Sequence, residues 1–115
     1  MEKVETFEAK ISIGFQEEYS DVFHSMDEVY SICQKYCDEV GLCVTITPTT
    51  FVYTNGYETG CFVGLINYPR FPSTKNEIKG HAESLSKLFL KEFKQLKISI
   101  ICSDETIMIQ PEDLS

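Results

Sequence analysis

The stretch from residue 42 to 68, LCVTITPTTFVY-TNGY-ETGCFVGLINY, decides the fold. Both arms are rich in β-branched and aromatic residues, which is typical of strands. Between them, Asn55-Gly56 is a strong hairpin signal, because both residue types tolerate positive φ. We therefore expect strands over 42–53 and 57–68, with a two-residue turn centred on Asn55-Gly56. The register that follows pairs Tyr53 with Glu58, Phe51 with Gly60 and Ile46 with Leu65.

This register divides the hairpin into two faces. One face carries Val44, Ile46, Val52, Cys61, Val63 and Leu65, and the other carries Thr45, Thr47, Thr49, Phe51, Tyr53, Phe62, Ile66 and Tyr68. Pro48 has no N–H to donate, so the first arm is predicted at a sheet edge.

Elements on either side of the hairpin follow from their periodicity. Apolar residues alternate with polar ones over 7–15, which predicts a half-buried strand. Ser25 and Glu28 form a capping-box pattern, and the helix that they begin is expected to end at Gly41. A second capping box, Thr74 with Glu77, precedes an apolar stripe that reaches Leu96 and predicts a helix of about six turns.

The last part of the chain is predicted to add two more strands. Residues 97–102 form a continuous apolar run typical of a well-covered strand, and 106–109 have the length of a short return strand. The order β-α-β-β-α-β is that of a ferredoxin-like α+β fold. We expect an antiparallel sheet with the first and third strands central, both helices on one face and a short extra C-terminal strand. Residues 1–110 form a single α+β domain and 111–115 a polar C-terminal tail.

Composition excludes several classes of function. The 115 residues include 18 acidic and 10 basic ones, net charge −8, which argues against nucleic-acid binding. No apolar run reaches the roughly 18 residues of a membrane helix, and the acidic start does not suit a signal peptide. Five cysteines without a CxxC pair or a zinc spacing indicate small core residues in a reducing cytoplasmic compartment. We expect no metal, no cofactor and no membrane partner.

One candidate ligand site is the loop over 67–74. Arg70 is the only arginine, two prolines stiffen the loop, and it leads into a helix N-terminus, which attracts anions. The predicted ligand-binding residues are Asn67, Tyr68, Arg70, Phe71, Ser73 and Thr74. The alternative is that Arg70 pairs with a surface carboxylate while Phe71 packs against the helix.

The second candidate surface is the sheet face that the helices leave open. It presents Phe51, Tyr53, Phe62 and Ile66, an apolar set that predicts a homo-oligomer interface. The alternative is that another segment of the chain covers this face. Hairpin arms of this length are also expected to project beyond the helices.

We expect a small cytoplasmic homo-oligomeric binding module that holds an anionic small molecule or a nucleotide near the Arg70 loop. The alternative is a non-catalytic acidic interaction factor that regulates or inhibits a basic partner protein. An enzyme with its site between subunits is a third hypothesis, disfavoured because the sequence has no recognisable nucleophile, base or metal set. His24 and His81 are expected to be ordinary, partly buried histidines.

Overall fold

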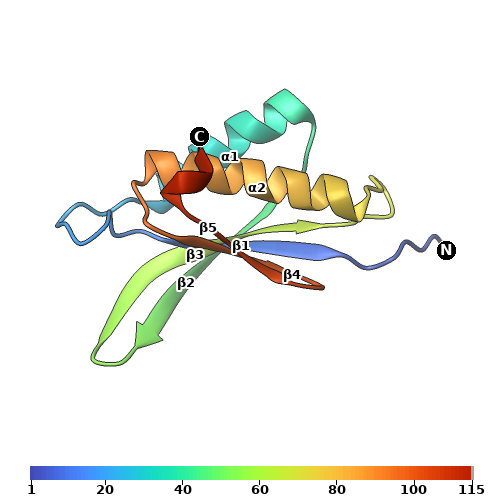
Figure 1. Ribbon diagram of the computed structural model, residues 1–115. Coiled ribbons are helices and arrows are strands. Elements are labelled where there is room, and N and C mark those ends of the chain that lie inside the picture. Colours follow the sequence, from blue (N-terminus) through green and yellow to red (C-terminus); the bar gives the residue numbers. More distant parts are fainter. Residues whose placement is uncertain (115) are drawn as a thin grey trace.

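The computed structural model describes residues 1–114 and consists of one five-stranded antiparallel sheet with two helices on one face (Figure 1). The sheet order is β2-β3-β1-β4-β5, so β1 and β3 are internal and β2 is an edge strand, as predicted. The fifth strand at the far edge makes this order differ from a four-stranded ferredoxin-like sheet. In chain order the elements are β1 Glu8–Gly14, α1 Met26–Val40, β2 Thr45–Tyr53, β3 Gly56–Ile66, α2 Lys75–Glu92, β4 Ile98–Cys102, β5 Thr106–Ile109 and the 3-10 helix Pro111–Leu114.

The core lies between the sheet and the helices. The alternating apolar residues of β1 all point into it, and Ala9, Ile11 and Ile13 are completely buried. Phe89 of α2 and Phe93, the C-cap of that helix, pack edge to face there, with ring centroids 5.4 Å apart. Burial of such side chains contributes about 1.5–3 kcal/mol each, so this layer is the main source of stability.

Both predicted helix starts are confirmed. Ser25 accepts from the N–H of Glu28 and the Glu28 carboxylate accepts from the N–H of Ser25, which completes the capping box of α1. Gly41 ends that helix in the left-handed region, with φ 71°. The end predicted for α2 is wrong. Lys94 adopts a φ of 49°, so the helix stops at Glu92 and Leu96 is exposed outside it.

The hairpin forms with a register that differs from the predicted one. Thr54 and Asn55 make the turn, with Asn55 at φ 63°, and Gly56 already belongs to β3. The observed pairs are Tyr53–Gly56, Phe51–Glu58 and Ile46–Val63. This is a slip of two residues along one strand, and because side chains alternate with a period of two, every residue keeps its predicted face.

The hairpin runs past the helix layer, as expected (Figure 1). Val52 therefore lies on the helix side of the sheet without being covered, and 81% of its surface is exposed. The prediction that β4 is a well-covered strand is wrong at Ile101, which points to the open face and is 42% exposed.

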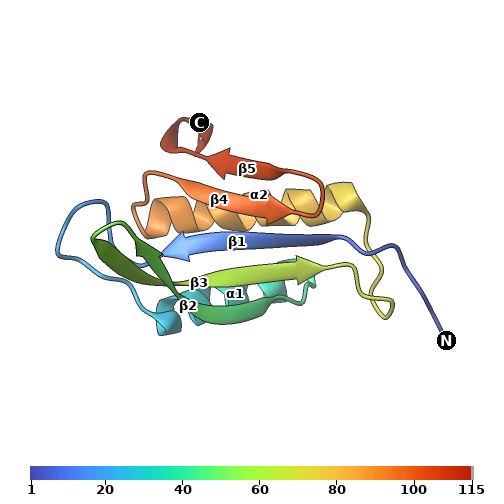
Figure 2. The same ribbon diagram turned by 90° about the horizontal axis from the view of Figure 1, so that it is seen from below.

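Viewed from below, the sheet lies in front of both helices (Figure 2). The sheet face turned toward the viewer in this figure is therefore the open face, which neither helix covers. Within residues 1–114, neither helix has the length and apolar composition needed to cross a bilayer.

Candidate functional site

A pocket of about 650 Å³ lies where the C-terminal end of α1 meets the start of α2. The end of β3, the turn after α1 and the loop before α2 complete its wall. Its lining consists of Cys37, Val40, Gly41, Leu42, Cys43, Leu65, Ile66, Tyr68, Phe71, Pro72, Ser73, Glu77, Ile78 and His81. A pocket of this size accommodates a drug-sized or nucleoside-sized molecule.

The loop that closes the pocket is held by one asparagine. The Asn67 side chain donates to the carbonyl of Glu5 at 2.9 Å and accepts from the N–H of Ser73 at 2.8 Å. The N–H of Phe71 donates to the carbonyl of Tyr68 at 3.1 Å, which tightens the turn between them. Asn67 therefore shapes the loop and does not line the pocket.

Glu77 occupies the N-terminus of α2. Its carboxylate accepts from the Ser73 hydroxyl at 3.2 Å and from the Thr74 hydroxyl at 3.1 Å. Thr74, the N-cap, in turn accepts from the N–H of Glu77 at 3.1 Å. The helix thus carries its own carboxylate at the position where a positive dipole end attracts anions.

The pocket is acidic rather than basic. Glu77 is the charged residue of its lining, and none of the lining residues named above is a lysine or an arginine. Arg70 lies outside the lining, with its guanidinium 5.4 Å from the ring centroid of Phe71. Of the six predicted ligand-binding residues, Tyr68, Phe71 and Ser73 border the pocket, and Asn67, Arg70 and Thr74 do not.

Two thiols and a phenol lie on one side of the pocket. Burial, followed by the hydrogen-bonded Cys43 thiol, raises the pKa of Tyr68. Burial is also the largest cause that raises the pKa of Cys37. Cys43 is exposed, so the prediction that all cysteines are core residues is wrong for this one. All five cysteines are free thiols.

Sequence reasoning treated His81 as an ordinary histidine and did not select Glu77 for the site. They stand four residues apart on α2, which places both side chains on one helix face. Nδ1 of His81 lies 2.8 Å from the hydroxyl of Tyr36 on α1. The i, i+4 spacing of Glu77 and His81 was visible in the sequence, but the contact between this part of α2 and the end of α1 was not.

The open face has the composition that was predicted. Phe51, Phe62 and Ile66 are half-buried there, and Tyr53 is 56% exposed. Phe51 and Phe62 contact each other edge to face, with centroids 5.7 Å apart. A Cβ at Gly60 would lie 2.2 Å from the carbonyl oxygen of Ile13, so only glycine allows this close strand approach.

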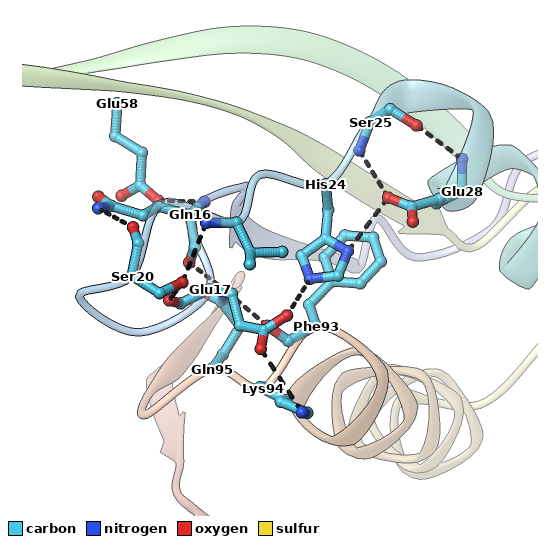
Figure 3. Close-up of polar contacts among 11 residues, drawn as sticks. Gln16, Glu17, Ser20, His24, Ser25, Glu28, Glu58, Phe93, Lys94 and Gln95 are labelled. Atoms are coloured by element: carbon cyan, nitrogen blue, oxygen red, sulfur yellow. Dashed lines mark hydrogen bonds and ion pairs between the residues drawn. The ribbon is translucent and has the colours of Figure 1, made fainter.

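A second polar cluster surrounds His24 (Figure 3). Its Nε2 lies 3.1 Å from Glu17 and its Nδ1 3.1 Å from Glu28. The ring stacks on Phe93 with centroids 4.2 Å apart and an interplanar angle of 3°. Lys94 is 3.6 Å from the other oxygen of Glu17. This cluster fastens the loop after β1 to both helices. Among residues 1–114, no group of three or more metal-ligating side chains is suited to hold an ion.

No protein-family model and no curated protein sequence matches the chain. Two solved structures resemble it. A phage SAM lyase in complex with S-methyl-5′-thioadenosine has a TM-score of 0.80 at 17% identity, over 97% of this chain and 96% of the other. A phage SAM lyase in the apo state has a TM-score of 0.78 at 17% identity, over 92% and 90%. At this identity the likeness shows a shared α+β fold.

Proposed function

We propose that this chain binds a sulfur-containing adenosine derivative in the pocket between the end of α1 and the start of α2. The observation that carries the proposal is the shared fold over 97% of the chain with a protein that holds S-methyl-5′-thioadenosine. S-methyl-5′-thioadenosine is a neutral thioether, and S-adenosylmethionine is its sulfonium relative. Because a fold alone does not carry a function, the pocket itself must have the chemistry for such a ligand.

The pocket chemistry supports this ligand class. Tyr68 and Phe71 line the pocket, and aromatic side chains of this kind can stack on a purine. The Glu77 carboxylate uses one acceptor site on each oxygen for Ser73 and Thr74 and retains capacity for a ribose hydroxyl. A sulfonium cation is favoured by the same carboxylate and by the aromatic rings.

An anionic ligand near Arg70, as predicted from the sequence, is the rival within the same site. A phosphate at the start of α2 would meet the Glu77 carboxylate, and Arg70 lies outside the lining. Like charges at such distances disfavour binding, so the geometry supports a neutral or cationic nucleoside better.

Isothermal titration of the wild-type chain with S-methyl-5′-thioadenosine, S-adenosylmethionine and AMP tests the proposal. Ligand at a hundredfold excess over Kd stabilises the folded state by about 2.7 kcal/mol, which thermal melting registers as a shift of about 10 °C. Glu77→Gln is expected to weaken binding about tenfold. Glu92→Gln removes the same charge from the other end of α2 and serves as the matched control.

Tighter binding of AMP, weakened by Arg70→Lys, would instead favour the anion site predicted from the sequence. If the wild-type chain binds none of the three compounds, the proposal is overturned. That result would also favour the alternative of an acidic interaction factor.

We propose in addition that the pocket cleaves S-adenosylmethionine by elimination. A side chain of the pocket takes a proton from the β-carbon of the methionine part while the bond from the γ-carbon to the sulfonium sulfur breaks. The sulfur keeps the electron pair of that bond as S-methyl-5′-thioadenosine, and the rest of the molecule leaves as an unsaturated amino acid. This second candidate is supported by the carboxylate of Glu77 and the imidazole of His81, two groups able to transfer protons, one helical turn apart in the lining. Chromatographic detection of S-methyl-5′-thioadenosine released from S-adenosylmethionine tests it. Release that persists unchanged in both Glu77→Gln and His81→Ala would refute a role for this pocket.

We also propose that the chain forms a homo-oligomer through the open face. The apolar set Phe51, Tyr53, Phe62 and Ile66 and the projecting hairpin support this. Light scattering should then give a mass of at least twice 13.2 kDa. Phe62→Lys should reduce that mass, and Leu88→Lys, which adds the same charge to an exposed position on α2, should not. A monomeric wild type at tens of micromolar would refute the interface.

Two further sequence predictions stay proposals. The order β2-β3-β1-β4 within the sheet supports a ferredoxin-like unit to which β5 is added. Five free thiols support a reducing, cytoplasmic compartment.

A further inference from the structure

Behind the pocket, the two helices meet through a tyrosine and a histidine. The hydroxyl of Tyr36 on α1 lies 2.8 Å from Nδ1 of His81 on α2, and the rings meet edge to face at 83°. His81 borders the pocket, whereas Tyr36 is outside the lining and packs against the core. Tyr36 is therefore placed to act on a ligand only through His81.

We propose that Tyr36 is a positioning residue that fixes His81 as a hydrogen-bond donor for the bound nucleoside, an inference that rests on the proposed function. A neutral imidazole carries its proton on one nitrogen and accepts at the other. With the Tyr36 phenol donating to Nδ1, the proton of His81 resides on Nε2. The Nε2–H then donates a hydrogen bond to an acceptor atom of the ligand.

The direction of the Tyr36–His81 hydrogen bond follows from the partners available. Nδ1 of His81 is the hydrogen-bond partner of the Tyr36 hydroxyl within residues 1–114. If Nδ1 carried the proton instead, the phenol proton of Tyr36 would be left without a partner in a part-buried site. Buried and partly buried polar groups are rarely left without a hydrogen-bond partner. On the ring's other side, Nε2 of His81 has no hydrogen-bond partner in the described part of the chain, and this leaves it available to the pocket.

This arrangement defines what the ligand must present. Glu77 accepts hydrogen bonds, and His81, one turn along the same helix face, donates one. A molecule with hydroxyl donors at one end and an acceptor nitrogen at the other satisfies both. A ribose joined to a purine has this chemistry.

Histidine side-chain NMR on the wild-type chain at about pH 8, where an ordinary imidazole is neutral, gives a direct test. The long-range proton–nitrogen pattern of His81 should show the Nε2–H tautomer with Nδ1 as acceptor. In Tyr36→Phe the pattern should change toward a mixture of tautomers. Tyr30→Phe is the matched control, because Tyr30 lies on the same helix, is half-exposed and does not border this pocket.

The binding measurement uses S-methyl-5′-thioadenosine as the probe. Tyr36→Phe should weaken its binding about three- to tenfold, the effect of one lost neutral hydrogen bond, and Tyr30→Phe should not. In a His81→Ala background, Tyr36→Phe should have no further effect on binding, because the two residues act as one unit.

An Nδ1–H tautomer in the wild-type chain overturns the inference. So does an equal loss of binding from Tyr36→Phe with and without His81. If the wild type fails to bind the probe, the proposed function fails, and the role of Tyr36 toward a ligand fails with it. The tautomer assignment is decided separately, because the NMR pattern is recorded without ligand.

Discussion

Replacing His24 with phenylalanine should destabilise the protein by about 1.5–2.5 kcal/mol. The phenyl ring preserves the stacking on Phe93 and removes both contacts with carboxylates. Hydrogen bonds to charged groups contribute about 1.5–3 kcal/mol each. The contact with Glu17, whose side chain is 19% exposed, should lie near the lower end, because Lys94 remains as a partner. Glu28 is half-exposed, so its contact is screened and contributes under about 1 kcal/mol.

Urea unfolding followed by far-UV circular dichroism measures this loss, and the chain has no tryptophan to provide an alternative signal. His24→Ala should cost about 1 kcal/mol more than His24→Phe, because it also removes the ring stacked on Phe93. Glu18→Gln, an exposed change in the same loop, is the control and should stay within about 0.5 kcal/mol of wild type. If His24→Phe is no less stable than this control, the carboxylate contacts drawn in Figure 3 do not stabilise the fold.

Three other outcomes are expected. Gly80→Ala should stabilise the chain by about 1 kcal/mol in the same assay, because Gly80 lies inside α2 and an added Cβ meets nothing within 4 Å; an unchanged midpoint would contradict this. A thiol reagent at about pH 8 should label exposed Cys43 first and Cys33 last, as followed by mass spectrometry, because burial raises the pKa of Cys33 to about 12; early labelling of Cys33 would refute its burial. The hydrogen bond from Lys75 lowers the pKa of Asp104 in the folded chain. The ionised Asp104 carboxylate therefore stabilises the fold at pH values above its ordinary pKa, and this stabilisation is lost as the pH falls through the pKa of the folded state. Between about pH 5 and 2, the urea midpoint of Asp104→Asn should therefore change less than that of the wild type.

Strong local signals predicted most of the secondary structure. The alternation over 7–15 and the capping residues Ser25 and Thr74 each depend on contacts within a few residues, so they are visible in the sequence. The hairpin turn was misplaced because Thr54-Asn55 and Asn55-Gly56 are both compatible with a turn. The predicted Asn55-Gly56 turn needs a positive φ at both residues, and Gly56 does not adopt one, whereas Asn55 does. The end of α2 was misplaced because the apolar spacing continues to Leu96, although the backbone reverses at Lys94.

The pocket was predicted only in part. The loop residues Tyr68 and Phe71 were recognised because prolines and an arginine mark that segment. Cys37, on the other hand, lines the same hollow as His81 although 44 positions separate them in the chain. Their approach depends on how α1 and α2 lie across the sheet, which periodicity within either helix does not determine.

The central place of β1 has a consequence for how the protein is made. This first strand pairs on one side with β3 and on the other with β4, and Ala9 lies opposite both Leu65 and Cys102. The ribosome therefore makes α1, the hairpin and α2 before β1 acquires its second neighbour. Until then the nascent polypeptide carries an unpaired edge of alternating apolar residues, the kind of segment that associates with other chains. High expression rates, or truncation of the chain before β4, are thus expected to favour aggregation.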